Sequence, residues 1–385
     1  MTAGILYAVY TLFGALTTIY GPTMAYLMQD YGIDYGQAGL LVTFTSVGRL
    51  ISVLAGGALS DKYGRKPLLI IGIFCWLVGL AGIGSISWYI GAVFFALLIG
   101  IGNGVVGATV NGAIADINRN YLSRSLNRLH MFFAIGCTLG PLLSGLILSY
   151  YSVWRTIYYI DALLGLIMLF LVATQVFPTI DINMKKTDKF SFKLKNIFEY
   201  NSIILIALIP LIYSGVGNSI NTWINKYMGD VANFQIFMAA GTLSIYNLGL
   251  ALGRFVNSIV SEKIGPVKSI LFSSIGALIF TLLSLFSSNA LIIVAALTMV
   301  GFFLGGLTPT AIAILGQMHP SKVGTASAVL TMAGTLGSML IPAAVGWLAD
   351  LWDIVGGMRS LTIPILILCI VAFNLYRRTI FKNNI

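Results

Sequence analysis

Long apolar stretches separated by short polar links run along the whole chain. Twelve of these stretches reach about 20 residues, the length that a helix needs to cross a bilayer. We predict membrane-spanning helices over residues 4–28, 36–59, 67–86, 89–115, 129–151, 156–177, 202–226, 235–260, 267–287, 290–316, 325–348 and 360–377. Apolar residues are continuous rather than alternating with polar ones, which favours helices over a membrane β-barrel. The pattern predicts an all-α membrane protein.

One link is much longer than the others. Residues 178–200 carry five lysines and divide the predicted spans into two sets of six. We therefore predict an N-terminal six-helix bundle over 1–177, a basic cytoplasmic linker over 178–200 and a C-terminal six-helix bundle over 201–385. The linker is either a solvated basic segment or an amphipathic helix lying on the membrane surface.

The two sets of spans read as copies of one another with a constant offset of 201 residues. Matched positions include Asp/Glu, Gly/Gly and Pro/Pro pairs without a gap. They are Gly14/Gly215, Gly48/Gly249, Asp61/Glu262, Gly64/Gly265, Gly100/Gly301, Gly104/Gly305, Thr109/Thr310, Gly136/Gly337, Pro141/Pro342 and Gly145/Gly346. Repeated halves are the sequence mark of secondary transporters, which alternate access around a site near the middle of the membrane.

Composition and charge agree with a membrane location. The chain is 58% hydrophobic and only 9% charged, whereas about a quarter of the residues in a soluble domain are charged. Of the 22 lysines and arginines, 17 fall in the links and tail that would lie on one side and 3 in those on the other. By the positive-inside rule this predicts a multi-pass cell-membrane protein with both termini cytoplasmic. The net charge of +10 then meets lipid head groups rather than nucleic acid.

The link Gly57-Ala-Leu-Ser-Asp-Lys-Tyr-Gly-Arg-Lys66 gathers four charges and a glycine between two apolar runs. It resembles the loop G-x-L-x-D-x-x-G-R-K between helices 2 and 3 of major facilitator superfamily (MFS) transporters, and the resemblance extends over the full chain. The resemblance implies the MFS fold, with 12 transmembrane helices in two pseudo-symmetric six-helix halves. It also implies that Asp61 faces the start of helix 11 and that Arg65 reaches Asp116. The alternative is that these charges only mark the topology.

The second-half copy of this link keeps an acid, Glu262, and the glycine, but has Pro266 where the first half has Arg65. We expect Asp61, Arg65 and Lys66, with Asp116 and Glu262, to act as a cytoplasmic gating latch, and the second-half latch to be the weaker one.

The fifth span contains Gly136-Cys-Thr-Leu-Gly-Pro-Leu-Leu-Ser-Gly145, which resembles the G-x-x-x-G-P-x-x-G-G element of MFS antiporters. Small residues let helices approach closely and a proline kinks a helix, so tight packing is a sufficient alternative. The element hints at export.

A second, weaker resemblance is to bacterial fucose/glucose–proton symporters. Its matches are residues 126–130, residues 102–104 with Asn111, and residues 213–215 with Trp223. Gly107 and Gly217 stand where that family has or often has a carboxylate, so the expected proton-carrying groups are missing.

The resemblance places helices 1, 4, 7 and 10 around a central cavity. Span 202–226 carries polar residues at helical spacing, and unpaired amides facing lipid would be costly, so this face points inward. The candidate cavity residues are Tyr10, Arg49, Asn103, Asn111, Tyr213, Asn218, Asn221, Thr222 and Asn225. Neutral donors and acceptors beside aromatic rings suit hydroxyl-rich solutes. The alternative for any one of them is interhelical hydrogen bonding, worth about 0.6–2 kcal/mol per contact.

Two charges within spans are further candidates. Arg49 lies twelve residues before Asp61, about 18 Å deeper along the helix, and either binds substrate or pairs with a carbonyl or carboxylate. Asp161 is the acid placed well inside a span, and it is a candidate for coupling.

We predict a secondary transporter that moves a small polar, sugar-like solute by alternating access. The alternative is an MFS drug or metabolite efflux antiporter. Protons are the candidate coupling ion, with uncoupled transport the other option. We expect no enzymatic activity, cofactor or metal, because no Ser/His/Asp set, phosphate loop or Cys/His cluster is present in the sequence. We also expect a monomer.

Overall fold

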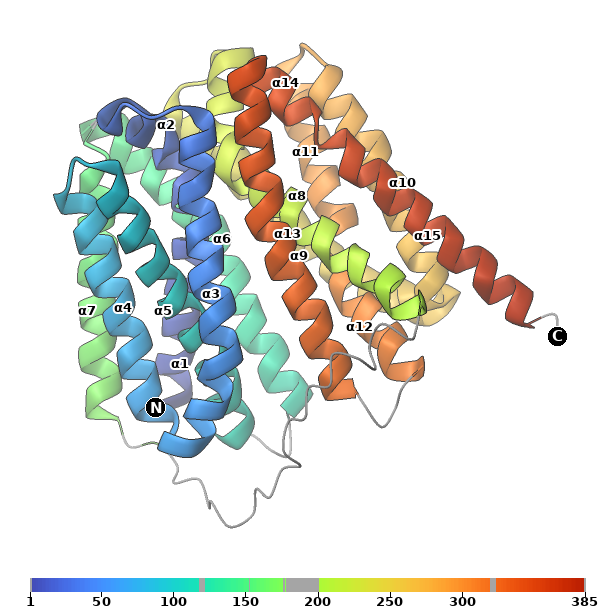
Figure 1. Ribbon diagram of the computed structural model, residues 1–385, viewed down its shortest axis with the longest axis horizontal. Helices are drawn as coiled ribbons and strands as arrows, with labels where there is room; N and C mark the ends of the chain where they lie inside the picture. Colours follow the sequence, from blue (N-terminus) through green and yellow to red (C-terminus); the bar gives the residue numbers. More distant parts are fainter. Residues whose placement is uncertain are drawn as a thin grey trace. The chain divides into compact units, whose positions relative to one another are not determined.

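The computed structural model describes residues 2–117, 122–151, 153–175, 177, 201–318 and 323–383, and these segments are built from α-helices (Figure 1). They contain no β-strand. Ten of their helices are long and apolar enough to cross a membrane, or eleven if one bent pair counts as a single span. The predicted span 36–59 is also helical, as part of α3 (Tyr35–Tyr63), but lies outside that count. The prediction of an all-α membrane protein is confirmed.

Seven helices cover the described part of the first half. They are α1 (Thr2–Thr17), α2 (Tyr20–Tyr31), α3, α4 (Arg65–Ser85), α5 (Tyr89–Ile117), α6 (Leu122–Tyr151) and α7 (Arg155–Thr174). The predicted first span is broken, because α1 and α2 meet at a bend of 46°. In a continuous helix, Pro22 would have no N–H for the carbonyl of Thr18 and its ring would crowd that carbonyl. Instead, the Gly21 N–H bonds the Thr18 carbonyl at 3.2 Å. The Thr18 hydroxyl also bonds back to the Ala15 carbonyl at 2.9 Å, so the helix is interrupted there.

Eight helices cover the described part of the second half. They are α8 (Asn201–Ala232), α9 (Ile236–Ile264), α10 (Pro266–Phe286), α11 (Ala290–Leu304), α12 (Leu307–Met318), α13 (Val323–Leu351), α14 (Ile354–Arg359) and α15 (Thr362–Asn383). The predicted span 290–316 is divided into α11 and α12 at Gly305 and Gly306. Pro309 lies four residues after Gly305, whose carbonyl it would crowd in a continuous helix. The short helix α14 was not predicted.

The chain divides into two compact units. One consists of residues 1–187 with 235–244, and the other of residues 188–234 with 245–385. The first turns of α9 thus group with the first unit and the rest of that helix with the second. The predicted linker 178–200 lies outside the described residues, so its form stays a prediction.

In the first unit, α3, α4 and α5 run side by side, and two glycines bring α3 and α5 into backbone contact (Figure 1). A Cβ placed on Gly48 would lie 2.2 Å from the carbonyl oxygen of Leu97, and one on Gly100 would lie 1.9 Å from that of Thr45. Any side chain at either position would therefore have to displace a backbone segment. Small residues at such crossings are the usual means by which membrane helices approach closely.

The second unit has the same kind of close backbone contact at two glycines, a glycine seam, between α9 and α11. A Cβ on Gly249 would lie 2.3 Å from the carbonyl oxygen of Thr298, and one on Gly301 would lie 2.4 Å from that of Tyr246. All four residues stand 201 positions after their first-half counterparts. The offset read from the sequence is therefore also the offset of the helix packing.

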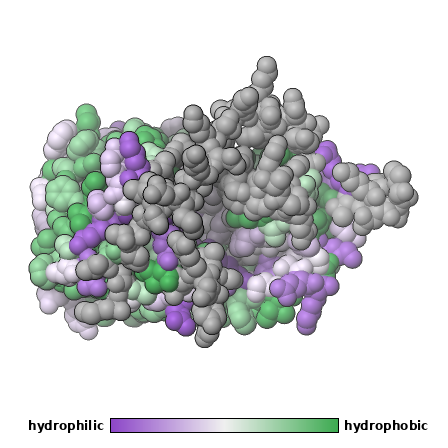
Figure 2. All heavy atoms as spheres, turned by 90° about the horizontal axis from the view of Figure 1, so that it is seen from below, coloured by the Kyte–Doolittle hydropathy of each residue, from purple (hydrophilic) through white to green (hydrophobic). Residues whose placement is uncertain are grey.

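Large apolar side chains are exposed along the helices, as expected for surfaces that face lipid. Phe74, Phe94 and Phe170 are examples, with more than half of each side chain exposed. Figure 2, which views the molecule from below, shows hydrophilic residues interspersed with hydrophobic ones beside the atoms drawn in grey. Exposed apolar side chains are stable against lipid tails, and hydrophilic ones are stable against water.

Candidate functional site

The first candidate region is the turn that joins α3 to α4. Gly64 occupies this turn with φ of 95°, a backbone conformation that favours glycine, and its N–H bonds the Ser60 carbonyl at 3.1 Å. The turn ends α3 and directs the chain into α4 at once, so Arg65 is the first residue of the new helix.

Arg65 anchors this turn to α5. Its Nε donates to Asp116 Oδ2 at 2.9 Å and its Nη1 donates to Ser60 Oγ at 2.8 Å. The Arg65 side chain is only 8% exposed. A Cβ on Gly112 would lie 2.7 Å from Arg65 Cζ, so this glycine leaves the space that the guanidinium fills. The contact between Arg65 and Asp116 that the family resemblance implies is present.

Lys66 anchors the same turn to α7. Its Nζ donates to the carbonyl oxygens of Ala173 at 2.6 Å and Gln175 at 2.8 Å, at the C-terminal end of that helix. A cation there satisfies carbonyls that have no partner in the helix and opposes the negative end of the helix dipole. Asp61 lies in the last turn of α3, but its side chain is outside the described set, so its place in a latch stays a prediction.

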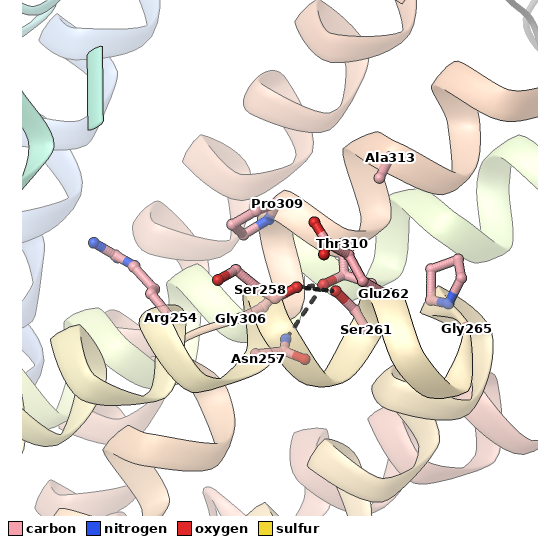
Figure 3. Close-up of a pocket in the computed structure, with 11 residues that line it drawn as sticks. Arg254, Asn257, Ser258, Ser261, Glu262, Gly265, Gly306, Pro309, Thr310 and Ala313 are labelled. Carbon is pink, nitrogen blue, oxygen red and sulfur yellow. Dashed lines mark hydrogen bonds between the residues drawn. The ribbon is translucent and has the colours of Figure 1, made fainter. Parts of the chain in front are cut away.

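The matching turn of the second unit has the same backbone without the anchors. Gly265 has φ of 88°, and Pro266 begins α10. A pocket of about 440 Å³ lies beside this turn, between α9 and α12 (Figure 3). Its lining includes Ser261, Pro266 and Ala313, the counterparts of Ser60, Arg65 and Gly112. The pocket thus occupies the place that the Arg65 guanidinium fills in the first unit.

Glu262 and Arg254 both line this pocket, yet Arg254 extends away from Glu262 (Figure 3). Deeper in the wall, buried Asn257 donates to Thr310 Oγ1 at 3.3 Å and accepts from the Ser269 hydroxyl. Glu262 itself is exposed. The predicted latch residue of the second half therefore borders an open pocket.

A second candidate region surrounds Tyr10 on α1. Asn111 of α5 donates from Nδ2 to the Tyr10 hydroxyl at 2.8 Å and to the Gly107 carbonyl at 2.7 Å. The His130 ring stands edge-on to Tyr10 with 5.7 Å between ring centres. Arg49 of α3 is exposed and lies close enough to Tyr10 for an electrostatic interaction. Three predicted cavity residues, Tyr10, Asn111 and Arg49, are thus brought together.

Asn103 is not part of this cluster of polar contacts. It is buried, and its Oδ1 accepts a hydrogen bond from Trp76 Nε1 at 2.8 Å. The bond joins α5 to α4, and satisfies the indole N–H inside the unit. Interhelical hydrogen bonding, the alternative to a cavity role, describes Asn103.

The polar residues of α8 fall into two groups, those that form hydrogen bonds to other protein groups and one that forms none among the described residues. Asn218 Nδ2 donates to the Ser338 carbonyl on α13 at 2.9 Å, and Thr222 bonds back to the Asn218 carbonyl at 2.7 Å. Asn221 Oδ1 accepts from Asn247 Nδ2 on α9 at 3.0 Å. Asn225 differs from these three, because neither its side-chain oxygen nor its nitrogen has a hydrogen-bond partner among the described residues, although both are buried.

Two residues of α9 belong beside this face and were not predicted. Asn247 bonds Asn221, and the Tyr246 hydroxyl is buried without a hydrogen-bond partner in the described segments. A polar residue in the apolar span 235–260 was the available signal. It was passed over because the resemblance assigns the cavity lining to other helices.

Tyr213 pairs with an arginine in the second unit. Arg254 of α9 donates from Nη2 to the Tyr213 hydroxyl at 2.7 Å and from Nε to the Gly305 carbonyl at 3.3 Å. Each unit thus has an arginine of its second long helix within electrostatic range of a tyrosine of its first, but only Arg254 and Tyr213 are joined by a hydrogen bond.

Asp161 lies apart from these groups. It sits in the second turn of α7, and its neighbour in electrostatic terms is Tyr158, whose hydroxyl is 3.3 Å from Thr23 Oγ1. No hydrogen bond or ion pair connects Asp161 to another residue of the described segments. Within the same segments, no group of three His, Cys, Asp or Glu side chains could hold a metal ion.

Comparison with known proteins identifies a transporter family over nearly the whole chain. The family described as Major Facilitator Superfamily matches residues 6–245 and 241–383. The uncharacterized MFS-type transporter YfkL of Bacillus subtilis is 24% identical, with 90% of this chain and 89% of that protein covered. The cis,cis-muconate transport protein of Acinetobacter baylyi is 24% identical (83% and 80% covered), and the sialic acid transporter NanX of Escherichia coli is 25% identical (90% and 87% covered).

Solved structures share the fold at lower sequence identity. The nucleoside transporter NupG matches with a TM-score of 0.81 at 13% identity, covering 97% of this chain and 97% of that one. A D-xylose-proton symporter matches with a TM-score of 0.78 at 16% identity, covering 97% and 96%.

Proposed function

The chain belongs to the Major Facilitator Superfamily and is a secondary transporter rather than an enzyme, and from that premise we propose that it carries a small polar, sugar-like solute by alternating access. In this mechanism, two repeated halves rock around a site near the middle of the membrane. The seams Gly48–Gly100 and Gly249–Gly301 are consistent with halves that move as rigid bundles.

The observation that carries the proposal is the open amide of Asn225. Buried polar groups are nearly always hydrogen-bonded, and an amide left without a partner costs about 1–3 kcal/mol. A solute hydroxyl can both donate to the Asn225 oxygen and accept from its nitrogen. The unpaired hydroxyl of Tyr246 on the next helix adds a further polar group of the same neutral kind.

The printed substrates of relatives agree with a polar organic solute. A sialic acid transporter and a D-xylose-proton symporter handle sugar-type molecules by name, and the cis,cis-muconate transport protein handles an organic acid. The sugar-like class is our proposal for this chain. Protons are the coupling ion we propose to test, with Asp161 as the acid candidate.

We also propose that the turn at Gly64 works as a gating latch at the predicted cytoplasmic end. Arg65 and Lys66 hold the turn to α5 and α7, which would present Asp61 in a fixed position at the end of α3. Glu262 takes the matching role in the second unit without such anchors.

Uptake of radiolabelled hexoses into proteoliposomes, with and without an imposed pH gradient, tests this function. We expect uptake above that of empty liposomes, with an Asn225→Ala variant lowering it several-fold while protein yield is unchanged. A gradient-dependent rate that is lost in Asp161→Asn supports coupling through that acid. Absence of hexose uptake, combined with drug resistance on expression, would establish the efflux alternative instead.

A further inference from the structure

We infer that the first unit holds a binding site for an organic carboxylate, with the Arg49 guanidinium as its anchor and the Tyr10 hydroxyl as a second donor. The inference rests on the proposed function and narrows it, because an acidic sugar or a related hydroxylated acid is then the preferred solute and a neutral sugar a poorer one.

The position of Arg49 along its helix is the first step. α3 runs from Tyr35 to Tyr63, and Arg49 lies 14 residues from each end, or about 21 Å at 1.5 Å per residue. An arginine near a helix end can extend its head to the membrane interface, but this distance is beyond the length of the side chain. An ionised guanidinium at mid-membrane depth is costly in lipid, so it faces a polar space. The exposure of Arg49 shows that this space is accessible.

The second step is that Arg49 makes no hydrogen bond and no ion pair within the described part of the chain. Arg254, its nearest equivalent in the second unit, is hydrogen-bonded to Tyr213 and to the Gly305 carbonyl. Arg65 is likewise bonded to Asp116. Arg49 thus keeps its full set of donors, whereas Arg254 and Arg65 are bonded to protein groups.

The third step is the chemistry of its surroundings. Tyr10 lies within electrostatic range of Arg49, and its hydroxyl oxygen accepts from Asn111, which leaves the hydroxyl proton to be donated. A guanidinium presents parallel N–H donors that match the two oxygens of a carboxylate. Arg49 and Tyr10 together offer donors only, so an acceptor-rich, singly charged group fits them better than a hydroxyl. A phosphate dianion would call for more than one cation.

Ligand binding to the purified, full-length protein tests the inference. The probes are D-glucuronate and D-gluconate as acids, methyl D-glucuronate and D-glucose as neutral partners, and D-glucose 6-phosphate. We expect at least one of the acids to raise the melting temperature of the wild-type protein, because a ligand that binds the folded state stabilises it. We expect the neutral partners to have a much smaller effect.

Arg49→Gln should weaken binding of that acid by roughly 10- to 100-fold, the range for loss of a charge-assisted hydrogen bond. Arg49→Lys should bind the acid with an affinity between those of the wild type and Arg49→Gln, since lysine keeps the charge but lacks the parallel N–H donors of the guanidinium. Arg155→Gln is the matched control, because it removes a positive charge from the same unit, where Arg155 pairs with Asp30 at 2.7 Å. It should leave acid binding unchanged.

The inference is overturned if neither acid stabilises the wild-type protein, if glucose or the methyl ester stabilises it as much as the acid, or if glucose 6-phosphate exceeds both acids. It is also overturned if Arg49→Gln keeps the wild-type affinity. If Arg49→Gln does not fold, the comparison of acid with ester on the wild-type protein decides. Hexose uptake that persists in Arg49→Gln would support the proposed function and rule out the carboxylate site. Acid binding that depends on Arg49, without uptake of any probe, would support the carboxylate site and rule out the proposed transport function.

Discussion

The turns at Gly64 and Gly265 share a backbone but not the side chains that hold it. Both glycines have positive φ, 95° and 88°, and both lie directly before the first residue of a helix. The first turn is then fastened by the pair of Arg65 with Asp116, whereas the second begins its helix with Pro266 and borders an open pocket. The shape of the turn therefore depends on glycine, and the ion pair is a separate feature carried by one copy.

The differences between the two turns are coordinated in space. Arg65 fits because Gly112 has no side chain, and the counterpart of that glycine is Ala313, which lines the pocket. The counterpart of Asp116 is Gln317. At these three positions the second unit therefore has neither the cation, nor the carboxylate, nor the glycine. We expect the two turns to respond differently to substitution and the glycine seams of the two units to respond alike.

The largest effect should come from the seam that the units share. Gly100→Ala places a Cβ 1.9 Å from the Thr45 carbonyl oxygen, and Gly301→Ala places one 2.4 Å from that of Tyr246, so in both cases a helix must move. We expect each to destabilise the protein by about 3 kcal/mol or more, at the upper end of the range for overpacking. Size-exclusion profiles and melting temperatures of detergent-purified protein measure this.

Gly107→Ala is the matched control on the same helix as Gly100. A Cβ there meets only the Phe13 ring at 3.4 Å, an ordinary contact. It should leave the melting temperature unchanged or slightly raised, because alanine favours helix. Equal damage from Gly107→Ala and Gly100→Ala would show that the backbone seam is not what limits substitution.

The next effect should separate the two turns. Arg65→Ala leaves Asp116, which is 17% exposed, without its cation, and we expect a loss of about 2 kcal/mol, below the 3–5 kcal/mol of a fully buried pair. Pro266→Ala in the second unit should change stability by less than about 0.5 kcal/mol. Thermal unfolding of the two variants measures the difference, and Asp116→Ala together with the Arg65→Ala/Asp116→Ala double variant completes a double-mutant cycle for the pair. Similar losses for Arg65→Ala and Pro266→Ala would contradict the asymmetry.

A smaller effect should appear in transport rather than in stability. If the anchored turn is the stronger latch, Asp61→Asn should lower the uptake rate about tenfold, equivalent to about 1.4 kcal/mol. Glu262→Gln, beside the open pocket, should lower it less than threefold. Both variants should be produced at wild-type level. Unchanged transport by Asp61→Asn would remove the latch role from the first turn.

The features that could be read from the sequence are those with a regular spacing. The apolar runs predicted the helices. The offset of 201 residues predicted that the glycine seams of the two units correspond, because close backbone contacts admit only glycine. The contact of Arg65 with Asp116 followed from the family resemblance. The breaks after Thr17 and at Gly305 were missed, because the apolar pattern continues across them and only prolines four residues ahead mark the sites.

The site was less predictable, because a polar residue in an apolar helix does not indicate which neighbouring helix its side chain will contact. Asn103 and Asn111 lie on one helix eight residues apart, yet the first bonds Trp76 and the second bonds Tyr10. Which neighbour each amide meets is set by helix packing. Asn247 is a second example, since its partner Asn221 becomes evident only when α8 and α9 are in place.

The smallest predicted effect tests whether the space at Gly112 exists for Arg65. Alanine is favoured over glycine within a helix by about 0.5–1 kcal/mol. In the wild-type protein, Gly112→Ala would press on Arg65 Cζ at 2.7 Å, and since that group ends a flexible side chain, the clash should roughly cancel the gain. In an Arg65→Ala background the clash is absent, so Gly112→Ala should stabilise by the full amount. Ala313→Gly in the second unit should destabilise by the same 0.5–1 kcal/mol, because no guanidinium occupies that place. Melting temperatures of the four first-unit proteins form the cycle. A coupling energy of zero would mean that the glycine is present for another reason and that the two turns diverged one residue at a time.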